Sequence, residues 1–307
     1  MTGSGPIVDG MSRSPRRPPE LRRRIFRGSE ARRLGLLTSA DLRSTAWRRL
    51  FRDVYTDADL PITHDLRARA AGRYVIPGDA AIAGRSAAAL HGASLIPAEA
   101  PVEILSARDF GPVAGLKIHR GPLPENHVAP AYGVRVTTPA RTCWDLCRWW
   151  PPEEAVAHLD LLLARSAPSL PDLTVFIAGQ RDETGWRRVS ETVALADPLA
   201  ESPQESRIRV ALIRAGLPPP VGQYVLTDAG RFVARFDLAW PAARVAVEYD
   251  GAWHASREQL ERDRARLNRV LGAGWLVIHV TATRMQDDLP SLVREVRAAL
   301  QSRSLQA

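Results

Sequence analysis

The sequence predicts a multidomain α/β protein. The chain has 307 residues, of which 45% are hydrophobic, so it is long and apolar enough to form two or three cores. Helix-like and strand-like patterns alternate in residues 205–302, whereas residues 1–62 form short polar segments rich in arginine. We therefore expect a basic N-terminal part and a C-terminal α/β part, with an α+β region between them.

Positive charge is concentrated at the N-terminal end. The formal net charge is +8, and residues 1–52 hold thirteen arginines against Asp9, Glu20, Glu30 and Asp41. That segment therefore carries +9, and the rest of the chain is close to neutral. A basic segment of this kind attracts polyanions, so DNA is the expected partner.

Two features bear on the compartment. The sequence has no run of 18 apolar residues and no signal-type apolar segment after its basic start. Its only cysteines, Cys143 and Cys147, lie four residues apart on a predicted helix, where thiols more often pack as small apolar side chains than bind metal. We expect a cytoplasmic protein with no membrane partner.

Residues 1–62 are interpreted as a disordered arm over 1–20, followed by a winged-helix-like segment over 21–62. Ser29 and Thr38 are placed to cap two short helices, and a third is expected over residues 45–51, before a wing. An amphipathic helical cap with a solvated arginine face is the alternative. The predicted DNA-binding residues are Arg43, Arg48, Arg49 and Arg52.

Residues 63–193 form the expected α+β middle region, with helices over 81–92, 138–150 and 152–165. The pieces EARRLGLLTSADL, WRRLFRDVY, SAAALHG and TTPARTCWDL resemble the AbiEi family of abortive-infection antitoxins over roughly residues 24–165. This resemblance implies DNA binding or regulation and implies no chemistry. It leaves open whether the partner is a toxin or a second copy of the chain.

After a predicted linker over 194–204, the C-terminal module reads α-β-β-β-α-β-α. Helices are expected over 205–216, 256–274 and 289–303, and strands over 222–228, 231–240, 244–250 and 275–280. The last strand, WLVIHV, is an unbroken apolar run, which predicts a central position in the sheet.

Three carboxylates interrupt two of these strands. Alternate residues of a strand share a face, so Glu248 and Asp250 lie together, and Asp237 can join them from the neighbouring strand. Clustered carboxylates are costly unless a cation neutralises them, and Mg²⁺ or Mn²⁺ suits oxygen ligands. The alternative is an edge hairpin with one wet face, where acidic side chains are ordinary.

The segments FDLAWP, VAVEYDGAWH and RDRARLNRVLGAGWLVIHV resemble the PD-(D/E)xK nuclease superfamily, in particular domains related to very-short-patch-repair endonucleases. The resemblance covers about residues 203–300 and implies a restriction-endonuclease-like core. It assigns Asp237 and Glu248 as metal ligands, with Glu205 as the first-helix acid and His254 beside the scissile phosphate. Asp263 and Arg266 would brace the site, although an i, i+3 ion pair on one helix explains them equally well.

The module departs from the family at one position. Asp250 stands where these nucleases usually have a lysine, and the only lysine, Lys117, lies in another region. Asp250 is therefore either a member of the catalytic group or a turn residue before Gly251. Two functions follow: a metal-dependent DNA endonuclease, or a non-enzymatic antitoxin-like DNA-binding regulator with a degenerate nuclease fold.

Overall fold

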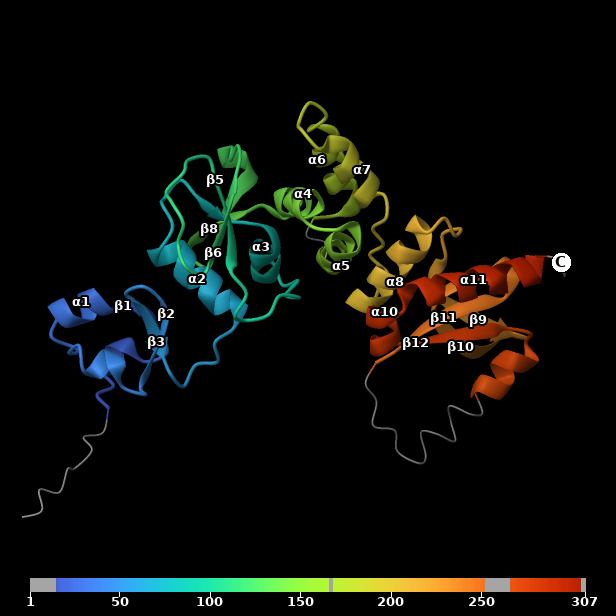
Figure 1. Ribbon diagram of the computed structural model, residues 1–307, viewed down its shortest axis with the longest axis horizontal. Helices are drawn as coiled ribbons and strands as arrows, with labels where there is room; N and C mark the ends of the chain where they lie inside the picture. The colour runs from blue at the N-terminus through green and yellow to red at the C-terminus, as the bar shows by residue number, and fades with distance from the viewer. Residues whose placement is uncertain (1–14, 166–167, 252–265, 305–307) are drawn as a thin grey trace, which may run out of the picture. The chain divides into compact units, whose positions relative to one another are not determined.

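The computed structural model describes residues 15–165, 168–251 and 266–304 (Figure 1). The chain falls into two compact units, one comprising residues 1–86 and 96–136 and the other residues 87–95 and 137–307. The described residues form three sheets with helices around them, which confirms a multidomain α/β protein. None of the described helices is long and apolar enough to cross a membrane.

The first sheet lies in the N-terminal module, residues 15–62, in the strand order β1-β3-β2. Phe26 and Trp47 pack edge to face in its core, with ring centroids 5.1 Å apart. Thr38 and Asp41 bond to each other's backbone N–H. The helix predicted after Thr38 is only the 3-10 turn η2, whose N-cap is Ala40, so this prediction is confirmed only in part. The elements are η1 (Pro19–Leu21), β1 (Ile25–Arg27), α1 (Gly28–Arg33), η2 (Asp41–Arg43), β2 (Trp47–Phe51) and β3 (Val54–Asp57).

The third helix predicted over residues 45–51 is wrong, because most of this segment is strand β2. It pairs with β3 around a two-residue turn at Arg52 and Asp53, where Asp53 has φ 60°. Aromatic residues favour strands, and the hairpin pairs backbone groups that a single helical turn would leave unpaired. Three of the predicted DNA-binding residues therefore lie on a β-hairpin: Arg48, Arg49 and Arg52.

Ser29 also differs from its predicted role, because it lies inside α1 and not at its N-cap. The carboxylate of Asp53, at the hairpin turn, accepts bonds from the Ser29 backbone N–H at 2.7 Å and from its hydroxyl at 2.5 Å. The first turn of α1 is thus capped by a residue distant in sequence.

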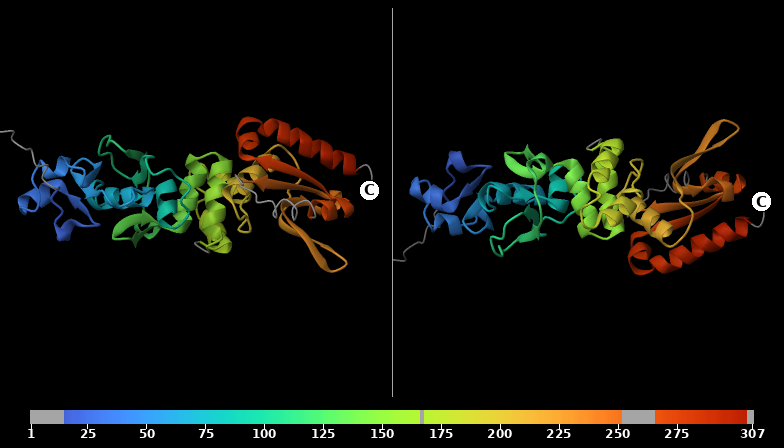
Figure 2. Two further views of the ribbon diagram at one scale, coloured as in Figure 1. Left: turned by 90° about the horizontal axis from the view of Figure 1, so that it is seen from below. Right: turned by 90° about the horizontal axis from the view of Figure 1, so that it is seen from above.

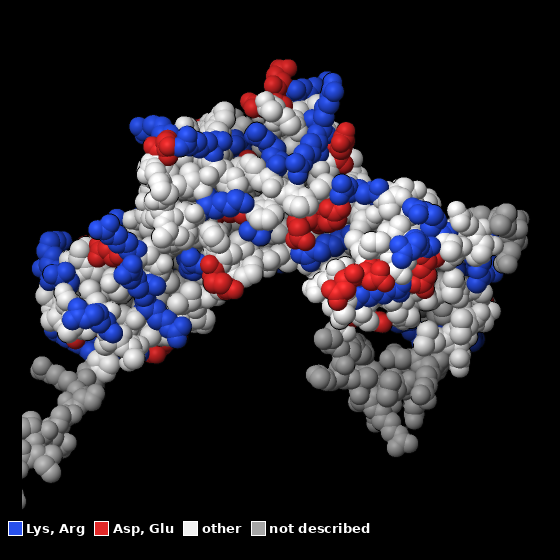
Figure 3. All heavy atoms as spheres, viewed as in Figure 1, with Lys and Arg blue, Asp and Glu red and all other residues white. Residues whose placement is uncertain are grey.

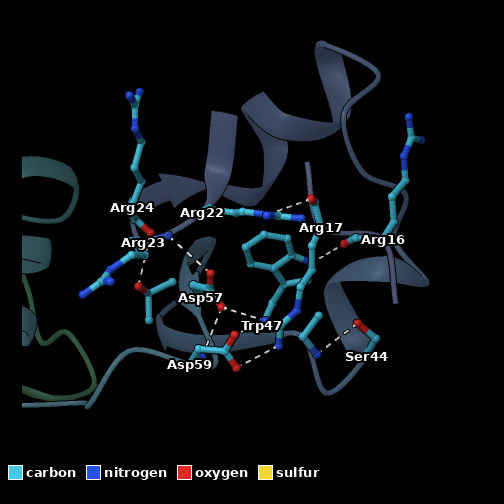
Figure 4. A network of polar contacts seen from close by, with 11 residues as sticks. Arg16, Arg17, Arg22, Arg23, Arg24, Ser44, Trp47, Asp57 and Asp59 are labelled. Atoms are coloured by element: carbon cyan, nitrogen blue, oxygen red, sulfur yellow. Dashed lines mark hydrogen bonds and ion pairs between the residues drawn. The ribbon is translucent and has the colours of Figure 1, made fainter. Parts of the chain in front are cut away.

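Of the arm predicted over 1–20, residues 1–14 lie outside the described residues, and residues 15–20 contact the rest of the N-terminal module (Figure 4). The Trp47 indole N–H donates to the Arg16 carbonyl at 3.2 Å, and Arg17 pairs with Asp57 and Asp59. A buried indole needs an acceptor and the two carboxylates need a cation, which explains why this segment is fixed. In Figure 4 the guanidinium group of Arg16 points away from this network.

A five-stranded mixed sheet, in the order β6-β5-β4-β8-β7, forms the rest of the first unit. The buried Ser86 hydroxyl is 2.7 Å from His64 Nε2 and accepts the Glu103 backbone N–H at 2.8 Å. The elements are α2 (His64–Tyr74), β4 (Ala81–Ile82), α3 (Gly84–Leu90), β5 (Val102–Ser106), β6 (Leu116–Arg120), η3 (Glu125–His127), β7 (Val128–Ala131) and β8 (Val134–Thr137). The helix predicted over 81–92 is found only in part, as α3, because Ala81 and Ile82 form strand β4. Residues 87–90 of α3 belong to the second unit.

Four helices follow in the second unit: α4 (Pro139–Trp149), α5 (Pro152–Leu163), α6 (Leu170–Ala178) and α7 (Trp186–Val193). Cys143 and Cys147 are fully buried in their shared core. Burial raises the pKa of both thiols, so they stay protonated and act as small apolar side chains. The packing interpretation of these cysteines is confirmed.

A buried ion pair joins helix α8 (Pro203–Arg214) to α5. The Arg209 guanidinium is 2.6 Å from the Asp160 carboxylate, which also accepts the Ser206 hydroxyl at 2.6 Å. Arg207 forms a two-point bond with Glu154 nearby. The expected linker boundary over 194–204 therefore falls inside the second compact unit.

The C-terminal sheet has the order β12-β11-β10-β9. Its first three strands in sequence are antiparallel, and β12 runs parallel to β11. The predicted turn at Ala229 and Gly230 is found, with φ 47° and 76°. The elements are β9 (Val221–Asp228), β10 (Arg231–Trp240), η4 (Pro241–Ala243), β11 (Val245–Asp250), β12 (Leu276–Thr281), α10 (Ala282–Asp287) and α11 (Leu289–Ser304).

The predicted central position of the WLVIHV strand is wrong, because β12 is an edge strand among the described residues. Ile278 and Val280 are buried, whereas Leu276 and His279 are exposed. An apolar run indicates that at least one face of a strand is buried, but it does not indicate whether the strand is central or at the edge of the sheet.

The two faces of this sheet are covered differently. Leu238 and Val247 pack with α8 and α11 on one face, and Figure 2 shows α11 lying along the sheet. On the other face Ala239 and Ala246 pack with Trp275, which leads into β12. The β9–β10 hairpin extends beyond the rest of the sheet in both views of Figure 2.

Candidate active site

A cleft of about 540 Å³ opens on the face of the C-terminal sheet opposite α11. Its lining combines acidic, basic and apolar side chains from three strands and from the helical residues 266–272. The residues are Arg235, Asp237, Glu248, Tyr249, Asp250, Gly251, Arg266, Leu267 and His279. Four of the predicted site residues therefore meet in one cleft: Asp237, Glu248, Asp250 and Arg266.

Asp237 lies at the centre of this group, on β10. Its Oδ2 accepts the backbone N–H of Tyr249 at 2.8 Å, which fixes the carboxylate against β11. Burial raises the pKa of Asp237, and the Glu248 carboxylate raises it further, whereas the bond from Tyr249 lowers it. The net rise in the pKa means that the ionised form of Asp237 is disfavoured relative to a free carboxylate, and a nearby cation would offset that cost.

Glu205, in the first turn of α8, is 6% exposed and adjoins the same group. Its Oε2 accepts the Glu201 backbone N–H at 3.1 Å and the Gln223 side-chain amide at 2.7 Å. Burial raises the pKa of Glu205, and the charge of Asp237 adds to this effect. Glu205 is thus electrostatically coupled to Asp237, although it does not line the cleft itself.

Glu248 is paired with a cation from the helical residues that precede β12. The Arg266 guanidinium donates a hydrogen bond to Glu248 Oε1. The Glu248 side chain is 11% exposed and that of Arg266 37%, so the pair lies at the boundary between the cleft wall and solvent. A ligand that entered the cleft would meet both groups.

Asp250, at the position where the nuclease resemblance leads us to expect a lysine, lies near the rim of the cleft. His279 Nδ1 of β12 is 3.2 Å from its Oδ1, and the two side chains are 50% and 39% exposed for Asp250 and His279 respectively. This position therefore holds a carboxylate with an imidazole partner, and Arg235 and Arg266 line the same cleft. Arg235 itself forms a two-point bond with Glu201.

The donor set fits a hard divalent cation in one particular way. Within the described parts of the chain, no three His, Cys, Asp or Glu side chains converge closely enough to hold an ion unaided. Mg²⁺ is commonly held by one or two carboxylates and completed by waters and phosphate oxygens. Asp237 and Glu248 lie on the neighbouring strands β10 and β11 and line the same cleft, which fits that pattern.

Two predicted site residues, His254 and Asp263, lie outside the described residues. The predicted DNA-binding residues Arg43, Arg48, Arg49 and Arg52 are all exposed in the N-terminal module. In Figure 3 basic side chains outnumber acidic ones on the visible face of that module. No carboxylate among the described residues forms an ion pair with any of these four arginines.

Three residues near the carboxylates were not predicted from the sequence. Gln223 bonds to Glu205, His279 approaches Asp250, and Arg235 lines the cleft beside Asp237. Strand parity from Asp237 predicts the position of Arg235, since both are on β10. His279 pairs with Glu248 across the parallel strands β11 and β12, so its place near the site can be predicted only when the strand order is known. No local sequence pattern marks Gln223 as a site residue.

Two curated relatives are similar to part of this chain. Both are uncharacterized proteins of Mycobacterium tuberculosis, from strains CDC 1551 / Oshkosh and H37Rv, and each is 31% identical over 170 residues. The match covers 55% of this chain and 62% of each relative, so it spans less than two thirds of the relatives' length. No family model matches the chain, and no solved structure matches it significantly.

Proposed function

We propose that the C-terminal module is a Mg²⁺- or Mn²⁺-dependent DNA endonuclease, with DNA also contacted by the basic N-terminal module. The observation that carries the proposal is the meeting of Asp237 and Glu248 in one cleft, with Glu205 of α8 electrostatically coupled to Asp237. Structural carboxylates are seldom clustered at such electrostatic cost, and functional ones often are.

The roles follow from the positions of the side chains. Asp237 and Glu248 would hold the ion, which orients and activates water and stabilises the departing oxygen. The backbone N–H of Tyr249 fixes Asp237, and Glu205 adds negative charge that strengthens cation binding. Arg266 and Arg235 line the same cleft and can neutralise a phosphate that enters it.

A nicking assay on supercoiled plasmid tests this proposal. The wild type should convert plasmid to the nicked form with Mg²⁺ or Mn²⁺, and the double variant Asp237→Asn/Glu248→Gln should not. These substitutions preserve side-chain shape, so matching thermal unfolding profiles serve as the folding control. Equal nicking by wild type and double variant would contradict the catalytic claim.

A second candidate is supported by a separate observation. Asp250 replaces the lysine of related nucleases and faces His279, while four exposed arginines lie in the N-terminal module. We infer that, if cleavage is absent, the chain is a DNA-binding regulator whose nuclease-like module serves in docking. DNA binding would then survive Asp237→Asn/Glu248→Gln in a gel-shift assay, and would be lost in Arg48→Ala/Arg49→Ala/Arg52→Ala. Metal-dependent cleavage of excess DNA would exclude this candidate.

A further inference from the structure

Gln223 has an unusual backbone conformation for a strand residue. It lies within β9 but has φ 50°, in the left-handed region that residues other than glycine seldom adopt. Its neighbours pair regularly with β10, Tyr224 with Phe236 and Gly222 with Leu238. The irregularity is therefore confined to Gln223, and the β10 residue between those two partners is Asp237.

The side chain of Gln223 is directed to the carboxylate group. Its Nε2 donates to Glu205 Oε2 at 2.7 Å, the shorter of the two bonds on that oxygen. The bonds from the Glu201 backbone and from Gln223 both end on Glu205 Oε2. The Ser202 side chain also bonds to the Glu205 carboxylate. An amide donor on one oxygen orients the carboxylate and favours its ionised form.

The other end of the same amide is unsatisfied. Gln223 Oε1 is excluded from solvent and has no hydrogen-bond partner in the described parts of the chain. Burying an amide oxygen without a donor is unfavourable, and such groups commonly mark a bound water, an ion or a functional role. A strained backbone and an unsatisfied oxygen thus occur in one residue beside two acidic side chains.

We propose that Gln223 is a positioning residue of the candidate active site, which orients the Glu205 carboxylate next to Asp237 and presents its own Oε1 to a water in that group. This role of Gln223 rests on the proposed metal-dependent function, because the carboxylates that it orients are those of the proposed metal site. It also gives a reason for glutamine at a position where glycine would relieve the backbone conformation. A purely structural strand residue would gain nothing from this geometry.

The test uses Gln223→Gly, with Ala229→Gly as the matched control. Ala229 has φ 47°, nearly the same as Gln223, but lies in the β9–β10 turn away from the cleft. Each substitution is made in the wild type and in Glu205→Gln, and thermal midpoints are measured without metal. Mn²⁺ affinity of the wild type and of the two single glycine variants is then measured by calorimetry.

The two glycine variants should differ in both measurements. Gln223→Gly should raise the thermal midpoint more, or lower it less, in the Glu205→Gln background than in the wild type. In the Glu205→Gln background the substitution removes no hydrogen bond to a charged group. Ala229→Gly should shift the midpoint equally in both backgrounds. Mn²⁺ affinity should fall by roughly 10-fold or more in Gln223→Gly, in line with the loss of a residue that orients a ligand group, and should not change in Ala229→Gly.

Either of two results would overturn the role of Gln223. One is an equal midpoint shift for Gln223→Gly in both backgrounds, and the other is unchanged Mn²⁺ affinity in Gln223→Gly while the wild type binds Mn²⁺. Absence of Mn²⁺ binding by the wild type would count against the proposed function instead. The thermal comparison would then still decide whether Gln223 and Glu205 are coupled.

Discussion

The Arg266 guanidinium is bonded to the Glu248 carboxylate in the wall of the cleft that also contains Asp237. This pair places a protein cation on a carboxylate that the proposed function assigns to a metal ion. Two cations on one carboxylate compete, so the ion pair and the metal are thermodynamically linked. Arg266 also lines the cleft, so its guanidinium can contact a phosphate that enters beside Glu248.

Replacing Arg266 should have opposite effects on metal binding and on cleavage. In Arg266→Gln, Mn²⁺ should bind more tightly in the absence of DNA, by about 10-fold if the pair is worth roughly 1.4 kcal/mol. Cleavage should slow, because the positive charge near the phosphate is removed. Calorimetry and a nicking time course measure the two effects.

The charge-matched control is Arg294→Gln, on α11 at the opposite face of the sheet, where Arg294 is exposed. It should change neither quantity. Weaker Mn²⁺ binding in Arg266→Gln would contradict the competition between Arg266 and the ion.

Glu205→Gln should stabilise the fold at neutral pH while it impairs metal binding. The folded-state pKa of Glu205 is raised, chiefly by burial, so its contribution to stability is present at acid pH and is lost as pH rises through the folded pKa. Glutamine has the same shape but cannot ionise, so the variant does not lose this stability as pH rises. Each kcal/mol of unfolding free energy gained should raise the thermal midpoint by roughly 2–4 °C. The gain should disappear in acid, where Glu205 is protonated in both states. A Glu205→Gln variant less stable than the wild type at pH 7 would contradict this assignment.

Much of the candidate site was predictable because strand geometry is local. Alternation along β11 placed Glu248 and Asp250 on one face, and the turn at Pro241–Ala243 brought Asp237 beside them. Glycine and proline at the turns fixed the pairing of β9, β10 and β11. These relationships need only residues that are near one another in sequence.

The remaining features depend on contacts between distant residues. Trp47 is in a strand because β3 and Phe26 are available to pair and pack with it, which its own neighbours do not reveal. The edge position of β12 depends on the order of the whole sheet. The anchoring of α8 on α5 depends on Asp160 and Arg209, which are 49 residues apart. Gln223 was missed for the same reason, since its bond is to a different element.

The buried pair of Asp160 and Arg209 should make stability depend on pH. Burial raises the pKa of Asp160 to about 6, against the opposing effect of Arg209. Because the folded-state pKa is raised, the contribution of Asp160 is present below about pH 4 and is lost as pH rises to about 6. Relative to Asp160→Asn, the wild type should therefore lose unfolding free energy over this range, measured by urea denaturation. Parallel curves for the two proteins would contradict the raised pKa.

Removing only one partner of that pair should be costly. Arg209→Leu leaves the Asp160 carboxylate buried at 1% exposure without its cation, which typically destabilises a protein by about 3–5 kcal/mol. The double variant Asp160→Asn/Arg209→Leu should recover part of this loss. An Arg209→Leu variant as stable as the wild type would show that α8 is held by other contacts.

The hairpin arginines should dominate the salt dependence of DNA binding. For each phosphate that Arg48, Arg49 or Arg52 no longer neutralises, the slope of log affinity against log salt should become shallower by about 0.9. Successive strand residues face opposite sides, so Arg48→Ala and Arg49→Ala should have unequal effects. A control variant with Arg181, Arg187 and Arg294 changed to Ala, all exposed in the second unit, should keep the wild-type slope. Equal reductions in the two triple variants would indicate unspecific charge attraction.

The proposed nuclease site at Asp237 and Glu248 is tested most directly by multiple-turnover nicking of supercoiled plasmid in molar excess over protein, with Mn²⁺ as the metal. Wild type and the control Asp228→Asn, at an exposed residue that ends β9, should nick several plasmids per protein molecule, and nicking should stop when the metal is chelated. Asp237→Asn, which keeps the shape of the side chain that Tyr249 fixes, should reduce the rate by a factor of about 10² or more. Equal rates for Asp237→Asn and Asp228→Asn, or no nicking by the wild type, would contradict a nuclease site at Asp237 and Glu248.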